Sequence, residues 1–482
     1  MLFRHTSQYM ISSVVVAVLG FLSAAVFTRL LTPDDYGVYV VGFGVANFVS
    51  SMMFTWVRYS VMRFESEGDR ADVRMTALAA YIVSALLAPL LVVLVHSVAH
   101  IDWTRSLFSV VLSLGLSLFE MSQEMLRSRL KVRAYMIGSV LRSALAFGVC
   151  IVIAKLGGGG MGQLAGAALA YYLASALTAG EIWKGPRAPM DADKLRLFFW
   201  LGLSITAGGV FATFQLSLDR LFLAWRFGDA YAGLYGASAD VVKQIILIPA
   251  GSVAAAAFPL TVRIFTTGSA EDTRRQLART GELLLAVLAP AAVGLGLTAP
   301  YLVSFLLGPS FRDTAVQVMP IVAFAWLFQS LSQSYIHVSY HLAMKQWMSI
   351  PHGIAALGAN CAMLWPLTTH FGFIGAAWSL LISEAFGAVV SYLFTLRAYP
   401  LPLVPGAIRR VAVSCGWMAV GVLWLERYLT QYSAGAFLVL AVVGGAIYLA
   451  VGFLLDLCES RTTATRMFAT SPWGPLLRRL AV

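Results

Sequence analysis

Residues 9–31 read YMISSVVVAVLGFLSAAVFTRLL, an apolar run in which Arg29 is the only charged residue. About 20 apolar residues are enough to cross the hydrocarbon core of a bilayer as a helix. A second apolar run, 38–62, follows directly, so residues 9–31 are expected to be an uncleaved membrane helix and not a signal peptide. This segment predicts a chain that crosses a membrane more than once.

The composition of the whole chain agrees with this prediction. Of its 482 residues, 59% are hydrophobic and only 12% are charged, whereas soluble domains carry about 25% charged residues. A polytopic all-α membrane protein is therefore expected, and soluble enzymes and nucleic-acid-binding proteins are excluded. Apolar runs predict about 14 transmembrane helices, at 9–31, 38–62, 75–97, 106–126, 136–156, 163–183, 197–217, 234–257, 281–301, 316–338, 348–368, 372–396, 410–427 and 434–456.

The basic residues are distributed unevenly between the two sides of these predicted helices. Of the 34 Lys and Arg residues, 24 fall in the loops on the side that holds the N-terminus. Because cytoplasmic loops carry an excess of Lys and Arg, both termini are expected in the cytoplasm of a bacterial inner-membrane protein. The net charge of +11 then reflects topology and requires no anionic macromolecule as a partner.

Short sequence similarities recur six predicted helices apart. Tyr36-Gly-Val-Tyr39 resembles Ala232-Gly-Leu-Tyr235, and Gly166-Ala-Ala168 matches Gly375-Ala-Ala377. An even offset preserves orientation across the membrane, so the pattern predicts two six-helix lobes in a parallel pseudo-repeat. The expected organisation is an N-lobe at 1–196, a C-lobe at 197–400, and two additional helices with a basic tail at 401–482.

Several polar residues lie inside the predicted helices, where a charge costs about 2.5–3.5 kcal/mol and needs an explanation. Glu120 and Glu124 continue a polar stripe with Ser113 and Ser117, and Arg58 shares one helix face with Asn47. Such stripes are expected to face a water-filled or protein-lined interior.

Structural interpretations of these charges remain open. Asp240 and Lys243, three residues apart, could form an ion pair on one helix, and Arg58 could extend to the membrane interface. Arg29 could be an interfacial anchor. Serine and glutamine neighbours could satisfy Glu120 and Glu124, and a protonated Glu384 could bond to a neighbouring helix.

Several motifs resemble the Wzx-type polysaccharide flippases of the multidrug/oligosaccharidyl-lipid/polysaccharide (MOP) exporter superfamily. The similarity covers about residues 1–400 and depends on the order of the motifs. These are Thr28-Arg-Leu-Leu31, Pro33-Asp-Asp-Tyr-Gly-Val-Tyr39, Leu218-Asp-Arg-Leu-Phe-Leu223, Gly233-Leu-Tyr235, Gly308-Pro-Ser-Phe311 and Gly372-Phe-Ile-Gly-Ala-Ala377.

The resemblance implies two lobes around a central cavity and movement of undecaprenyl-diphosphate-linked oligosaccharides to the periplasmic leaflet. In related lipid II flippases, basic residues of the first, second and eighth helices line that cavity, a role that passes here to Arg29, Arg58 and Lys243. Asn47 and Arg220 are also expected to contact substrate. The candidates for proton or cation coupling are Glu384, Asp240, Glu120, Glu124 and Asp219.

Other functions are less consistent with the sequence. A cation or drug antiporter shares the superfamily fold, but basic cavity residues favour an anionic substrate. Residues 63–74 lack the glycine-and-arginine signature of major-facilitator proteins, and the short loops disfavour a membrane glycan polymerase or ligase. No nucleotide or metal motif is found, so no cofactor is expected. The expected partners are the lipid-linked oligosaccharide, membrane lipid and glycan polymerase or export proteins, with the chain itself a monomer.

Overall fold

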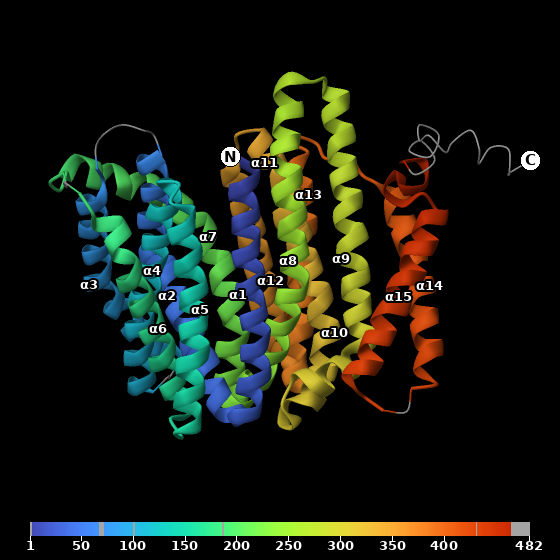
Figure 1. Cartoon of the computed structure of the whole chain (residues 1–482), viewed down its shortest axis with the longest axis horizontal. Helices are drawn as coiled ribbons and strands as arrows, with labels where there is room; N and C mark the ends of the chain where they lie inside the picture. The colour runs from blue at the N-terminus through green and yellow to red at the C-terminus, as the bar shows by residue number, and fades with distance from the viewer. Residues whose placement is uncertain (1, 67–71, 100–101, 186–187, 430, 464–482) are drawn as a thin grey trace, which may run out of the picture. The chain divides into compact units, whose positions relative to one another are not determined.

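The computed structural model describes residues 2–66, 72–99, 102–185, 188–429 and 431–463, which contain helices and no strands. Fourteen helices of 21 or more residues account for most of this part of the chain (Figure 1). They are α1 (Leu2–Leu30), α2 (Pro33–Ser66), α3 (Arg74–Ala99), α4 (Trp103–Ser128), α5 (Val132–Lys155), α6 (Gly159–Trp183), α7 (Ala192–Phe227), α8 (Asp229–Thr267), α9 (Ala270–Leu306), α10 (Pro309–Leu331), α12 (Ile350–Phe371), α13 (Gly375–Thr395), α14 (Pro405–Glu426) and α15 (Ala434–Leu454).

Each of the fourteen predicted spans coincides with one of these helices, which confirms the all-α polytopic fold. By length and composition, ten helical stretches of the described chain can cross a membrane, and two of them, Pro309–Leu342 and Gln346–Thr395, contain more than one helix. Short elements complete the chain: the π-helix η1 (Ser332–Ile336), α11 (His337–Leu342) and the 3₁₀ turns Gln346–Ser349, Gly372–Ile374 and Leu457–Glu459.

The predicted connection at 258–280 is largely helical. Residues 258–280 were expected to connect two spans, but α8 continues to Thr267 and α9 begins at Ala270, so Arg263 and Arg275 lie on helices. Hydropathy marks only the apolar part of a helix, whereas charged residues such as Arg and Glu also favour helical structure outside the membrane. Figure 1 shows α8 and α9 as a long antiparallel pair.

The chain forms two compact units. Unit 1 comprises Met1–Val241, Leu306–Ala315 and Ala356–Ser379, and unit 2 comprises Val242–Phe305, Val316–Ala355 and Leu380–Val482. The predicted lobe boundaries at 196 and 400 stay a prediction.

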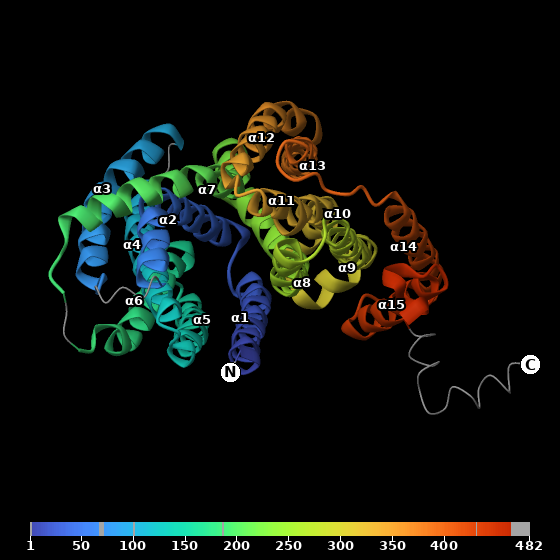
Figure 2. The same ribbon diagram turned by 90° about the horizontal axis from the view of Figure 1, so that it is seen from above.

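In unit 1, α4 packs against both α2 and α6, and α2 also packs along α7 (Figure 2). A buried apolar cluster that includes Ala46, Leu112 and Leu164 joins α2, α4 and α6. In unit 2, α14 and α15 lie side by side, and Tyr301 of α9 packs into their core with Met418 and Leu440. Apolar contacts thus hold these helices together. Their polar stripes are therefore available for other roles.

Three of the motifs that carry the family resemblance meet at one place in unit 1. The amide of Gly308, just before α10, donates to Thr28 Oγ1 of α1 at 3.0 Å. The ring of Tyr36 on α2 packs edge-on against Phe311 of α10, with centroids 5.5 Å apart. A Cβ on Gly37 would overlap the Asp229 carbonyl at the start of α8. Much of the motif pattern therefore serves close packing between helix ends.

Candidate functional site

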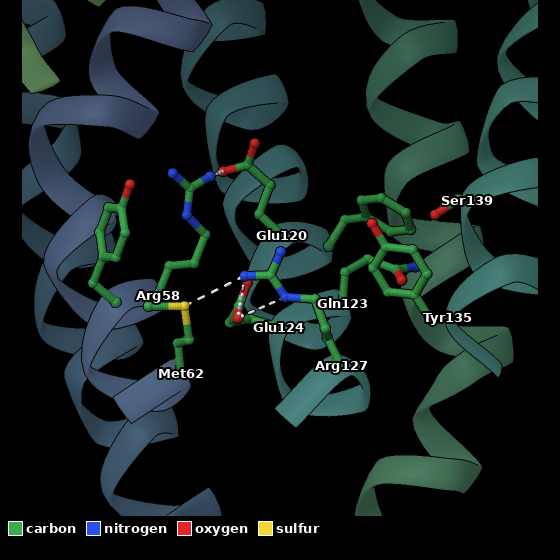
Figure 3. A pocket seen from close by; sticks show the side chains of 10 residues that line it. Arg58, Met62, Glu120, Gln123, Glu124, Arg127, Tyr135 and Ser139 are labelled. Carbon is green, nitrogen blue, oxygen red and sulfur yellow. Dashed lines mark hydrogen bonds and ion pairs between the residues drawn. The ribbon is translucent and has the colours of Figure 1, made fainter. Parts of the chain in front are cut away.

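A polar cavity of about 360 Å³ lies between α2, α4 and α5 of unit 1. Arg58 of α2 enters it from one side and donates from Nη1 to Oε2 of Glu120 on α4 at 2.9 Å (Figure 3). About a third of each side chain is exposed, 33% for Arg58 and 38% for Glu120. The predicted stripes on the two helices therefore face one another, and an arginine on one neutralises an acid on the other.

A second ion pair lines the same cavity one turn further along α4. Arg127 Nη2 donates to Glu124 Oε1 at 2.8 Å and also lies 3.4 Å from the sulfur of Met62. Glu124 is buried, while half of the Arg127 side chain is exposed. These two pairs give the cavity two acids and two arginines. Their charges cancel, which explains how two glutamates are tolerated within a membrane helix.

Gln123 lies between these two acids and was not among the residues predicted for the site. Its side chain is 7% exposed and lines the cavity, yet neither its amide oxygen nor its amide nitrogen has a hydrogen-bond partner. The sequence contains the spacing that predicts this position, because Gln123 lies three residues after Glu120 and therefore shares the polar face of α4. Arg127, one helical turn after Gln123, was also missed, since it was counted as a loop residue.

A second polar cluster in unit 1 surrounds Asp219 of α7. The buried carboxylate accepts hydrogen bonds from Tyr235 Oη of α8 at 3.0 Å and from Asn360 Nδ2 of α12 at 2.9 Å. Ser379 of α13 donates to Asn360 Oδ1 at 2.5 Å. Four helices thus contribute to one buried network, which we call the Asp219 cluster.

Arg220 and Asp240 lie beside this cluster. Arg220 Nη2 donates to Asp240 Oδ1 at 2.5 Å, which joins α7 to α8. The ion pair considered from sequence, Asp240 with Lys243, gave the wrong partner for Asp240. Lys243 belongs to unit 2, where its ammonium lies over the ring of Trp326 at 5.2 Å from the centroid.

The remaining predicted site residues are dispersed. Arg29 is exposed at the end of α1 and donates from Nη1 to the carbonyls of Ala25 at 2.5 Å and Leu306 at 2.9 Å. Asn47 donates to the carbonyl of Phe43 on its own helix at 2.9 Å. Glu384 is buried in unit 2. Of the predicted residues, Arg58, Glu120 and Glu124 share the cavity, and Asp219, Arg220 and Asp240 form the second group.

These observations define a polytopic helical membrane protein with charged sites inside its helix bundle. Residues 26–316 match the family of polysaccharide biosynthesis proteins. The match spans more than half of the chain, and the protein belongs to that family. Among curated protein sequences, none matches this chain.

Solved structures show the same fold. Lipid II flippase MurJ in an inward closed conformation is similar with a TM-score of 0.74 and 14% identity, covering 93% of this chain and 98% of that one. An inward-facing multidrug resistance MATE transporter of the MOP superfamily has a TM-score of 0.57 and 15% identity, covering 82% and 94%. A eukaryotic MATE transporter has a TM-score of 0.52 and 14% identity, covering 84% and 94%. The chain thus has the helical fold that these transporters share.

Proposed function

We propose that the protein moves an undecaprenyl-diphosphate-linked oligosaccharide across the bacterial inner membrane by alternating access. The observation that carries the proposal is Arg58, a guanidinium that lines a cavity between membrane helices. A diphosphate is a strong acceptor for such a group, because arginine offers a planar fork of donors that matches phosphate oxygens. The polyprenyl tail can stay in lipid while the head group enters the cavity.

Glu120 sets the chemistry of this binding step. In the structure its carboxylate holds Arg58, so an arriving diphosphate must displace it. Displacement of Glu120 from Arg58 by an anionic group favours its protonation, because the carboxylate loses its compensating charge next to a like charge. Substrate entry would thereby be linked to uptake of a proton, and departure of the substrate would restore the ion pair.

The Asp219 cluster is the second candidate for coupling. A buried carboxylate that accepts hydrogen bonds from a phenol and an amide can bind a proton or a small cation in their place. Because the groups of the cluster come from four helices, a change in occupancy at Asp219 would alter contacts between α7, α8, α12 and α13. This role for Asp219 agrees with ion-coupled cycling.

A cation or drug antiporter is the alternative, and the fold match to a multidrug MATE transporter favours it. Both hypotheses can be compared in liposomes that contain the purified protein and no nucleotide. The flippase proposal predicts faster leaflet exchange of a fluorescent undecaprenyl-diphosphate sugar than in protein-free liposomes, and no uptake of a cationic dye. Dye uptake without lipid exchange would establish the antiporter instead.

A further inference from the structure

The unpaired amide of Gln123 is the feature of the cavity that ion pairing does not explain. This side chain is more than nine-tenths buried, and its oxygen and nitrogen could together take part in four hydrogen bonds, none of which is formed. The amide reaches across to α5, where a Cβ on Gly138 would overlap its nitrogen. Gly138 of α5 therefore leaves space for an amide that forms no hydrogen bond within the protein.

The surroundings of Gln123 show what kind of ligand the cavity fits. The rings of Tyr59, Phe119 and Tyr135 contribute aromatic surface. Ser139, one turn after Tyr135 on α5, contributes a hydroxyl (Figure 3). Pockets of this kind bind ligands that have an apolar face and a few directed polar groups. A pyranose has both, because its ring C–H groups form flat faces and its hydroxyls donate and accept at the rim.

Other ligands fit the cavity less well. A cation would find both glutamates already neutralised by arginines. A wholly apolar compound would leave the Gln123 amide buried and unpaired, which disfavours binding. A ligand with vicinal hydroxyls pairs the amide and can also accept from Arg127 or donate to Glu124.

We infer that this cavity binds the sugar nearest the diphosphate of the lipid-linked substrate, and that Gln123 determines specificity for a sugar at that position. The inference rests on the proposed function, since Arg58 in the same cavity holds the adjoining phosphate. It assigns separate tasks to two residues. Arg58 recognises the charged group that all such lipids share, and Gln123 recognises the sugar attached to it.

The test compares two probes in nanodiscs, undecaprenyl diphosphate and undecaprenyl diphosphate that carries one hexose. Gln123→Met replaces the amide with an apolar side chain of similar shape. We expect affinity for the sugar-bearing probe to fall about tenfold, the equivalent of one or two hydrogen bonds, with little change for the sugar-free probe. The melting temperature of the free variant should equal or exceed that of the wild type, because an unpaired buried amide has been removed.

A matched control is Gln163→Met on α6. Gln163 is also buried, but its amide donates to the Cys150 carbonyl at 2.9 Å, away from the cavity. This change should leave the preference between the two probes unaltered. Ser139→Ala, on α5, offers a second variant that keeps the packing intact and should weaken only the sugar-bearing probe by a few-fold.

The outcomes separate the inference from the proposed function. Equal losses for both probes in Gln123→Met, or no loss for either, would overturn the sugar subsite. If the wild-type protein binds neither probe, or if Arg58→Ala binds both as the wild type does, the proposed function itself fails. A sugar-specific loss in Gln123→Met together with a loss of both probes in Arg58→Ala supports both.

Discussion

Gly37 of α2 and Gly233 of α8 lie in backbone contact, so close that a Cβ on Gly233 would approach the Gly37 nitrogen to 2.7 Å and its Cα to 3.0 Å. These glycines are equivalent positions of the two motif copies, Tyr36–Tyr39 and Ala232–Tyr235. The two similar segments found in the sequence therefore contact one another. Each glycine is required because the partner helix occupies the space of a side chain.

Gly233→Ala should accordingly separate the ends of α2 and α8. Overpacking of this kind costs about 1–3 kcal/mol, which thermal unfolding of the purified protein should report as a lower melting temperature. Gly148→Ala on α5 is the control, because a Cβ there meets nothing within 4 Å. That change should be neutral or stabilise the helix by about 0.5–1 kcal/mol. A similar change in melting temperature for the two variants would show that the contact between Gly37 and Gly233 is absent.

Glu120→Gln tests the proposed competition for Arg58. Without its carboxylate partner the guanidinium is free to bind phosphate, so undecaprenyl diphosphate should bind about three- to tenfold more tightly at neutral pH. Titration of the probe into nanodiscs gives the affinity. Glu271→Gln, which removes an exposed partner of Arg275 on α9, should have no effect. Weaker binding in Glu120→Gln would mean that Glu120 helps to hold the substrate.

The Arg220–Asp240 ion pair should be visible as an energetic coupling. Removal of one partner leaves a partly buried charge uncompensated, so Arg220→Ala and Asp240→Ala should each destabilise the protein. The double variant should be more stable than the sum of the single effects predicts, with a coupling of about 1–3 kcal/mol. A coupling near zero in this double-mutant cycle would indicate that the two side chains act independently.

Asp72 provides a pH-dependent contribution to stability outside the membrane helices. Partial burial alone would raise its pKa. Hydrogen bonds from Arg74 at 2.7 Å and from the Ala188 amide at 3.2 Å favour the ionised form, and together they hold the pKa below its usual value. A lowered pKa in the folded state stabilises the protein above the pKa of the unfolded chain, and this stabilisation disappears as pH falls through the folded value.

Asp72→Asn should therefore lower the stability by about 1–2 kcal/mol at pH 7, with a difference from the wild type that shrinks toward zero in strongly acidic buffer. Thermal melting across a range of pH measures the stability difference at pH 7 and its decrease at low pH. Asp34→Asn, at the first turn of α2, serves as a comparison for the general effect of losing a surface carboxylate. A difference that persists at low pH would contradict the assigned cause.

Much of the fold was predictable because each membrane helix contains its own apolar signal. The limits of that signal appear at Arg263, where hydropathy ends but helix α8 continues to Thr267. The site was predictable where a pattern on one helix sufficed, as for the stripe that contains Glu120. The ion pairs of the site were not predictable from the sequence. Asp240 binds Arg220 of the preceding helix, although Lys243 lies only three residues away on its own helix. Asn360 reaches Asp219 from 141 positions away, a proximity that only the packing of α12 against α7 creates.

The central claim is that Arg58 binds the diphosphate of a lipid-linked oligosaccharide during its passage across the membrane. The most direct measurement is the rate of leaflet exchange of a fluorescent undecaprenyl-diphosphate sugar in liposomes that contain wild-type protein, Arg58→Ala or Arg275→Ala. The last variant removes an exposed arginine of α9 that pairs with Glu271. We predict at least a tenfold slower exchange for Arg58→Ala, consistent with the loss of a charge-assisted bond, and wild-type exchange for Arg275→Ala. Wild-type exchange by Arg58→Ala would contradict the account.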